Sequence, residues 1–381
     1  MVRPGADIVT PAILLDLNIL ESNIKKFQQM AAKGNKTLWP MVKTHKSTTL
    51  ARIQQACGAT GFLCGTLDEC EALLRTGIKN LMYAYPVANE PNISRVIRLA
   101  GSCNFYLRLD HHRQAEILNQ AAKLAGTYVN YTVIINSGLN RFGIAPWELE
   151  GFMQTMSQYK NLKFKGISTH PGHVYGSKGL ASAAQDETRT MDEAVHALGR
   201  ARLYPEIVSS GSTPTFQYVT NDTVINMLHP GNYMFMDNLQ ISLGCAKETD
   251  CALTILATVI SARKDESGND IYIIDTGSKC FGDQEVHGNS SIKERYGRIK
   301  NHPGLELYSL SEEVGKIIAM RKNISLNIGD KIEIIPNHSC CAANMTSWYI
   351  GMRDGAVDQE MPLISVDIRG NSGHKLSTPH S

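Results

Sequence analysis

The chain has 381 residues, of which 43% are hydrophobic and 19% charged, so it can bury the core of a large globular protein. Its 38 basic and 36 acidic residues leave a net charge of +2, which argues against nucleic acid as a partner. No apolar run reaches the roughly 18–20 residues that cross a membrane. The first residues lack a secretory signal pattern, and the nine scattered cysteines indicate reduced thiols, so we expect a cytoplasmic protein.

An amphipathic helix is expected over residues 16–32, because apolar side chains recur there at helical spacing. After it, short apolar runs alternate with helical patterns as far as residue 228. Eight strands are expected, at 38–42, 61–65, 81–85, 104–108, 130–135, 164–168, 206–209 and 224–228, and the last is the weakest. Eight strands that alternate with helices predict the α/β class and an N-terminal (β/α)8 TIM barrel.

The pattern changes near residue 240, where β-branched runs are separated by turn signals and not by helices. These runs cover 251–263, 271–275, 315–319 and 331–335. They predict a C-terminal, mostly antiparallel β domain. We therefore expect the barrel over residues 12–242 and the β domain over residues 1–11 and 243–381.

Lys43 follows directly on the first apolar run of the barrel. The end of a barrel strand points into the mouth of the fold, where ligands bind. Desolvation there, with Lys46 nearby, lowers the pKa of an ammonium group until the neutral amine can form a Schiff base. The alternative is a surface lysine whose ammonium group simply reaches water at the end of a strand.

Several other strands are followed by polar, glycine-containing segments. Residues 208–214 (VSSGSTP) carry small side chains and backbone N–H groups that can surround a phosphate, and Tyr233 could join them. Arg141 lies on the turn after the fifth strand, and residues 169–175 (THPGHVY) offer two histidines and a tyrosine. Ordinary tight turns and structural histidines are the alternative.

His338 and Cys340 end a strand of the β domain. In an extended segment, side chains two residues apart project to the same face, so both can reach one ion. Nitrogen with soft sulfur favours zinc, and two protein ligands leave positions open for a catalytic Lewis acid. The alternative is a buried cysteine beside a surface histidine.

Taken together, these segments resemble the D-serine dehydratase and D-threonine aldolase family, pyridoxal-phosphate enzymes of fold type III that are related to the alanine racemases. The resemblance covers nearly the whole chain and implies a homodimer. It implies that Lys43 is the Schiff-base lysine and Lys46 an auxiliary cation. It also implies a set of cofactor-binding residues, with Arg141 near the ring oxygen, Tyr175 by the pyridine nitrogen, and Ser210, Gly211, Ser212, Thr213 and Tyr233 around the phosphate.

The metal pair bears on the reaction that the resemblance implies. The dehydratase branch typically carries His-x-Cys and zinc, whereas the aldolase branch more often has aspartate for the cysteine and accepts manganese or magnesium. We therefore expect a lyase, dependent on pyridoxal phosphate and zinc, that acts on small D-3-hydroxy amino acids, with D-serine dehydration as the reaction. Two departures concern the substrate: residues 39–41 read WPM where the family usually has Arg-Pro-His, and Val314 stands where it usually has histidine.

Other functions stay open at this point. A D-threonine or 3-hydroxy-D-aspartate aldolase would need a base near the metal, for which His45 and His173 are the candidates. Racemisation of an amino acid is the third candidate reaction, and the His-x-Cys pair argues mildly against it because racemisation needs no metal. A protein of another class, which binds pyridoxal phosphate without catalysis and serves its homeostasis, would have no use for the metal pair. The last alternative is a barrel enzyme unrelated to this family that acts on a phosphorylated substrate.

Overall fold

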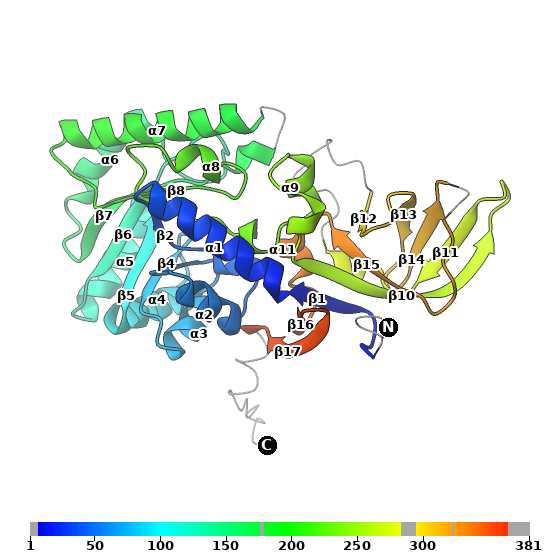
Figure 1. The fold of residues 1–381 in the computed structure, drawn as a ribbon. Helices are drawn as coiled ribbons and strands as arrows, with labels where there is room; N and C mark the ends of the chain where they lie inside the picture. The colour runs from blue at the N-terminus through cyan, green and yellow to red at the C-terminus, as the bar shows by residue number, and fades with distance from the viewer. Residues whose placement is uncertain (1–6, 176–178, 283–294, 322–323, 365–381) are drawn as a thin grey trace, which may run out of the picture.

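The computed structural model describes residues 7–175, 179–282, 295–321 and 324–364. It consists of two units that lie side by side, a barrel and a β-sheet domain, with helix α1 (Leu17–Lys33) extending from one toward the other (Figure 1). One buried hydrophobic cluster runs through both units, so they share a core. The expected fold class is confirmed. Within the described residues, no helix combines the length and apolar character needed to cross a membrane.

Eight parallel strands build the barrel. They are β2 (Thr37–Leu38), β3 (Phe62–Cys64), β4 (Asn80–Tyr83), β5 (Asn104–Leu109), β6 (Val129–Ile134), β7 (Leu162–Ser168), β8 (Ile207–Ser210) and β9 (Met227–Leu228). Neighbours pair in the order β2-β9-β8-β7-β6-β5-β4-β3. A parallel bridge between Met41 and Leu63 joins the two ends, with a hydrogen bond of 3.0 Å from Leu63 N to Pro40 O, so the barrel closes. The eighth expected strand, the weakest in the sequence, is only two residues long.

Helices follow the strands around the barrel. They are α2 (Thr48–Ala56), α3 (Leu67–Arg75), α4 (Glu90–Ser102), α5 (His112–Leu124), α6 (Leu149–Met156), α7 (Leu180–Arg200), α8 (Phe216–Val219) and α9 (Asn238–Ser242). Helix α3 shows why such segments are helical: Thr66 caps it by accepting a hydrogen bond from Glu69 N, acidic residues occupy its first turn, and Arg75 its last. The cap residue also lines the cavity described below, so the helix start fixes part of the site.

The second unit is a nine-stranded, mostly antiparallel sheet. Its strands are β1 (Ala12–Asp16), β10 (Leu253–Lys264), β11 (Asp270–Ile274), β12 (Gly297–Ile299), β13 (Leu305–Leu310), β14 (Gly315–Ala319), β15 (Lys331–Pro336), β16 (Trp348–Arg353) and β17 (Ala356–Pro362). The path runs β13-β14-β11-β10-β1-β16-β17, and β15 pairs with β10 and β12. Two short helices, α10 (Ser278–Phe281) and α11 (Ser339–Ala342), follow β11 and β15.

Strand β1 places the N-terminal segment in this sheet. It pairs with β10 in antiparallel and with β16 in parallel orientation. The expected boundary put residue 12 at the start of the barrel, but the β domain continues through Asp16, because the apolar run 13–15 is buried between two strands of the second sheet. Residues 365–381, which were assigned to the β domain, lie outside the described residues.

Candidate active site

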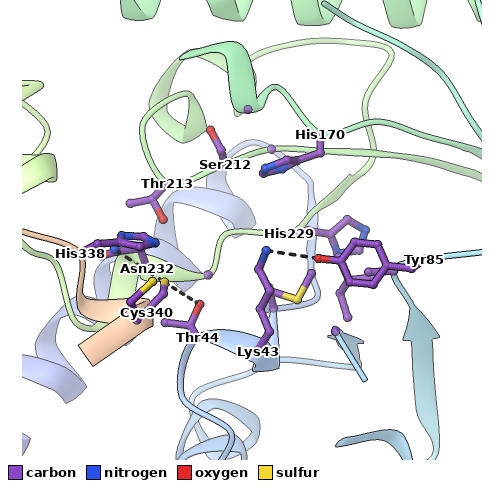
Figure 2. Close-up of a pocket in the computed structure, with 18 of the residues that line it drawn as sticks. Lys43, Thr44, Tyr85, His170, Ser212, Thr213, His229, Asn232, His338 and Cys340 are labelled. Carbon is purple, nitrogen blue, oxygen red and sulfur yellow. Dashed lines mark hydrogen bonds between the residues drawn. The ribbon is translucent and has the colours of Figure 1, made fainter. Parts of the chain in front are cut away.

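A cavity of about 640 Å³ lies at the mouth of the barrel. Segments that follow the barrel strands line one side, and His338 and Cys340 of the β domain line the other. Figure 2 shows Lys43 with Tyr85 on one side and His338 and Cys340 on the other. The barrel mouth and the β domain therefore form one site between them, as is common for barrel enzymes.

Lys43 lies in a short 3-10 turn, η1 (Val42–Thr44), and not on the end of a strand as expected. Its ammonium group lines the cavity and lies 3.4 Å from the hydroxyl of Tyr85. Gly65 packs against its stem, since a Cβ at Gly65 would lie 2.7 Å from the Cβ of Lys43. The side chain of Lys43 can therefore extend into the cavity only because residue 65 is a glycine.

The β domain holds the segment that carries this lysine. Asn344 Nδ2 donates to the carbonyl of Lys43 at 3.3 Å, and Cys340 Sγ lies 3.4 Å from the hydroxyl of Thr44. The next two residues are also bonded to the β domain. Tyr349 OH donates to the carbonyl of His45 at 2.5 Å, and the backbone amide of Ile364 donates to the carbonyl of Lys46 at 2.6 Å. All four residues 43–46 are thus bonded to the β domain.

The segment after β8 has the properties expected of an anion cradle. Gly211 has a φ of +104°, which glycine adopts readily, and Gly211, Ser212 and Thr213 line the cavity. The hydroxyl of Thr213 is buried, and no hydrogen-bond partner for it lies among the described residues. Because a buried hydroxyl is costly unless it is bonded, this group suits a ligand oxygen. The residues present therefore fit a phosphate.

Ser210 and Tyr233 do not reach the cavity, contrary to expectation. Ser210 and the amide of Gly211 both donate to the carboxyl group of Glu187 on α7, behind the cradle. Tyr233 is fully buried, and its hydroxyl accepts a hydrogen bond of 2.9 Å from Gln54. Tyr233 points into the core because its ring packs against Phe27, 5.0 Å away.

Arg141 and Tyr175 line the cavity as expected. The guanidinium group of Arg141 is exposed and lies 6.0 Å from the ring of Tyr85 and 5.4 Å from that of Phe142. Burial, helped by the negative charges of Cys340 and Asp237, raises the pKa of Tyr175, so its phenol stays neutral.

His45 and His173, the expected bases, do not line the cavity. His45 is fully buried between Gln54 and the amide of Ser47, and burial lowers its pKa to about 4. His173 packs beside Gly138. Strand-end sequences do not reveal which of several neighbouring side chains points inward, and here His170 lines the cavity instead of His173. We therefore do not retain His45 or His173 as catalytic residues.

His338 and Cys340 do come together, though not on an extended strand. His338 is extended and caps α11, and Cys340 lies in the first turn of that helix. The ring of His338 lies 3.3 Å, through Nδ1, from a carboxylate oxygen of the buried Asp237. Such a carboxylate commonly orients a metal-binding histidine. Within the described part of the chain, no group of three or more histidine, cysteine or carboxylate side chains is arranged to hold a metal ion.

The electrostatics of this pair favour a thiolate. Burial alone would lower the pKa of His338, but the charge of Cys340 and the bond to Asp237 raise it well above its usual value. Burial opposes ionisation of the Cys340 thiol, yet the imidazolium of His338 lowers its pKa. Zinc binds neutral imidazole and thiolate, so one nitrogen and one sulfur donor fit zinc once His338 releases its proton.

Comparison with known proteins shows to which family the chain belongs. The family model described as "Alanine racemase, N-terminal domain" matches residues 15–239. The chain belongs to this family. A second model, "Putative serine dehydratase domain", matches residues 252–352, so the family resemblance expected from the sequence, and with it the fold of the type III pyridoxal-phosphate enzymes, is confirmed.

Relatives in this family include both kinds of lyase. The chain is 29% identical to 3-hydroxy-D-aspartate aldolase of Paracoccus denitrificans, over 94% of this chain and 93% of the relative. It is 26% identical to D-serine dehydratase of Dictyostelium discoideum, over 89% and 92%. The structure of D-threo-3-hydroxyaspartate dehydratase from Delftia sp. HT23 superposes with a TM-score of 0.86 at 26% identity, over 95% and 99%. A cysteine-to-alanine variant of a D-threo-3-hydroxyaspartate dehydratase, described in a metal-free form, superposes with a TM-score of 0.86 at 25% identity, over 94% and 98%.

Four residues that line the cavity were not predicted from the sequence. Tyr85, Arg108, His229 and Asn232 all line the cavity. Each lies at or just after the end of a barrel strand, and that position is the signal that could have identified them. His229 is held by a hydrogen bond of 2.9 Å between Nδ1 and the carbonyl of Trp39, and burial and then Arg108 lower its pKa to about 3.

Proposed function

We propose that this protein is a pyridoxal-phosphate-dependent lyase of small D-3-hydroxy amino acids, with D-serine dehydration to pyruvate and ammonia as its reaction. One observation carries the proposal: the amine of Lys43, the cradle of residues 211–213 and the His338–Cys340 pair all face a single cavity. An amine, an anion site and a metal site in one chamber meet the three needs of this chemistry.

The residues of the barrel would bind and position the cofactor. Gly211, Ser212 and Thr213 take its phosphate, Lys43 is the amine that holds it, and Arg141 and Tyr175 face its ring. Bound pyridoxal phosphate supplies an electron-poor ring that stabilises negative charge at the substrate's α-carbon. The Nζ atom of Lys43, which lines the cavity, would in its free amine form be the base that takes the α proton.

The residues of the β domain would hold a metal ion. His338 and Cys340 supply one nitrogen and one sulfur, which favours zinc, with manganese or magnesium as the alternatives. Zinc at this position would supply a Lewis acid for the substrate's hydroxyl group. The metal-free form described for a dehydratase of this fold supports a metal site in the family.

The alternative is retro-aldol cleavage, as in a D-threonine or 3-hydroxy-D-aspartate aldolase. It is favoured by the 29% identity to an aldolase. Cys340 favours elimination, because the resemblance associates His-x-Cys with dehydratases. His170, which lines the cavity, replaces His45 and His173 as the candidate base for cleavage. A carrier without catalysis fits less well, since the β domain brings the metal pair into the same chamber.

A product assay separates the two reactions. D-serine and D-threonine are supplied to the purified protein, and pyruvate, 2-oxobutanoate, glycine and acetaldehyde are measured. We expect pyruvate and 2-oxobutanoate. Glycine with acetaldehyde as the main products of D-threonine would move the protein to the aldolase branch. Neither product set with any D-3-hydroxy amino acid would contradict the lyase proposal.

The resemblance also implies a homodimer, which we retain as a proposal. Light scattering on the purified protein is expected to give twice the 41.9 kDa of one chain. A single-chain mass at micromolar concentration would contradict it.

A further inference from the structure

Glu187 is a buried carboxyl group behind the anion cradle of residues 211–213. It lies on α7, is fully buried, and does not line the cavity. Its Oε1 atom accepts hydrogen bonds from the hydroxyl of Ser210 and, at 2.9 Å, from the amide of Gly211. Its Oε2 atom is buried and has no hydrogen-bond partner among the described residues. One oxygen of this carboxyl group therefore holds the start of the cradle, while the other makes no bond within the described part of the chain.

The same carboxyl group is linked to a second point of the cradle through Thr215. The hydroxyl of Thr215 lies close enough to Glu187 to lower the pKa of its carboxyl group. That hydroxyl also accepts a hydrogen bond of 3.3 Å from the amide of Ser212 and lies 3.1 Å from the hydroxyl of Ser212. Ser212 lines the cavity. The conformation of the cradle therefore depends on Glu187 directly at Gly211 and indirectly at Ser212.

The surroundings of Glu187 favour its protonated form. Burial raises the pKa of its carboxyl group to about 7, although the hydrogen bonds from Ser210 and Gly211 and the hydroxyl of Thr215 act in the opposite direction. Among charged groups, Asp222 has the largest effect, and it raises the pKa further because it is itself a carboxylate. Residues 208–216, which form the cradle and its flanks, contain no lysine, arginine or histidine. Below pH 7 the carboxyl group is therefore mostly neutral.

The elements packed against α7 bring no lysine or arginine to this carboxyl group. They include α6, α8 and the 3-10 helices η2 (Pro146–Glu148) and η3 (Gly172–Tyr175). Their titratable side chains are Glu148, Glu150, His173, Tyr175 and Tyr218. Glu148 accepts a hydrogen bond from the amide of Ala145, and Glu150 pairs with Arg200 at the surface. The charge of an ionised Glu187 would therefore be poorly compensated.

We propose that Glu187 is a positioning residue of the cradle and couples phosphate binding to the uptake of a proton. The inference rests on the phosphate-binding part of the proposed function. An ionised Glu187 would lie against the backbone of the cradle, at low dielectric, where it would repel a bound dianion. A neutral Glu187 still offers Oε1 to Ser210 and Gly211, so it holds the cradle without that repulsion.

The affinity of the cradle for a dianion should fall as pH rises. Without a ligand, Glu187 releases its proton at a pH of about 7. If the anion binds only to the neutral form, its affinity is nearly complete at pH 6 and about one tenth of that at pH 8. Binding at pH 8 should then take up about one proton per chain, whereas binding at pH 6 should take up almost none.

The test uses sulfate, which stays a dianion over this pH range, so that only groups of the protein titrate. Its binding to the full chain freed of cofactor is measured by calorimetry in two buffers of different ionisation enthalpy, which gives the affinity and the proton uptake. In the wild type the affinity should fall about tenfold from pH 6 to pH 8. Glu187→Gln keeps an oxygen acceptor and cannot ionise, so its affinity should equal that of the wild type at pH 6 and stay constant, without proton uptake. Glu193→Gln, which changes an exposed carboxylate on the same helix, should behave like the wild type.

A second variant tests the positioning role apart from the charge. Glu187→Ala removes the acceptor for Ser210 and Gly211, so sulfate affinity should fall about tenfold at pH 6 and show no dependence on pH. If this variant does not fold, the comparison of Glu187→Gln with the wild type still decides. Parallel pH profiles for the wild type and Glu187→Gln would overturn the inference, and so would a folded Glu187→Ala protein that binds sulfate as the wild type does at pH 6.

The same titration with pyridoxal phosphate, and with pyridoxal, which lacks the phosphate, separates this inference from the proposed function. The difference in pH profile between the wild type and Glu187→Gln should be present with pyridoxal phosphate and absent with pyridoxal. If the wild type binds pyridoxal phosphate and Glu187→Gln has the same pH profile, the coupling is refuted and the lyase proposal stands. If sulfate shows the coupling but pyridoxal phosphate does not bind, the coupling stands and the proposed function is refuted.

Discussion

At the scale of single residues, close packing against two glycines limits where the side chains of the site can lie. Lys43 can enter the cavity because Gly65 has no Cβ, and Gly231 leaves room for the hydroxyl of Thr44, which a Cβ would approach to 2.5 Å. The place of Lys43 at the cavity was predictable because it follows an apolar run, but nothing in the sequence distinguishes His170 from His173 as the histidine that lines the cavity. Those two histidines are three residues apart on the turn after β7, where His173 lies in a short 3-10 helix (Gly172–Tyr175) and His170 precedes it.

A methyl group at residue 65 should displace the lysine. Gly65→Ala places a Cβ 2.7 Å from the Cβ of Lys43, so the amine must shift. We expect about a hundredfold loss of turnover, since a misplacement of about 1 Å has effects of that size. Gly101→Ala is the matched control, because its Cβ would meet nothing within 4 Å on helix α4. Equal activity of both variants would contradict the packing argument.

Glu187 should make stability depend on pH. Burial raises its pKa from 4.5 to about 7, so the folded protein holds a proton that the unfolded chain releases between these values. Stability from this group is therefore greatest below pH 4.5 and falls by about 3 kcal/mol as pH rises to about 7. In Glu187→Gln, urea unfolding across this range should lack that decline, whereas Glu150→Gln on the surface should retain it. Parallel stability curves for Glu187→Gln and wild type would contradict this.

At the scale of elements, the strand-to-helix turn from β15 into α11 brings His338 and Cys340 to the cavity. The two-residue spacing predicted that His338 and Cys340 lie close together, and they do. The expected cause was an extended strand, whereas the structure aligns them through the first turn of a helix. The barrel strands were predictable because apolar runs alternate with helices. Strand β17 was not, because its side chains are mostly exposed and its three central residues are polar, so that no apolar pattern marks it.

Loss of the thiol should remove the metal. In Cys340→Ala we expect bound zinc, measured by elemental analysis of purified protein, to fall from about one ion per chain to background, because one nitrogen alone holds zinc weakly. Cys103→Ala, which changes the C-cap residue of α4 and not a residue that lines the cavity, should keep its zinc. Zinc retained in Cys340→Ala, or activity unaffected by a chelator, would contradict the metal site.

For the whole molecule, the β domain acts as the second wall of the site and as the support of the lysine turn. Asn344, Tyr349 and Ile364 bond to residues 43–46, about 300 positions earlier in the chain. A single sequence carries no pattern for contacts at such separation, so these could not be predicted. Their consequence is that the lysine's backbone is fixed only when both units are folded and packed together.

Removal of one of these bonds should loosen the lysine. In Tyr349→Phe the carbonyl of His45 loses its hydrogen bond from a fully buried phenol, so stability should fall by about 1 kcal/mol and cofactor affinity should fall with it. Tyr204→Phe, at a residue 81% exposed, is the control and should change neither. A stable Tyr349→Phe protein with unchanged affinity would contradict the supporting role of the β domain.

The central claim is that Lys43 is the amine that holds pyridoxal phosphate. The most direct measurement is the visible spectrum of the purified protein, followed by borohydride reduction and mass spectrometry of the peptide that contains residue 43. We predict a coloured protein whose cofactor is fixed by reduction on Lys43, with the band lost in Lys43→Ala and kept in Lys46→Ala. A reducible chromophore that persists in Lys43→Ala, or a label on another lysine, would contradict the account.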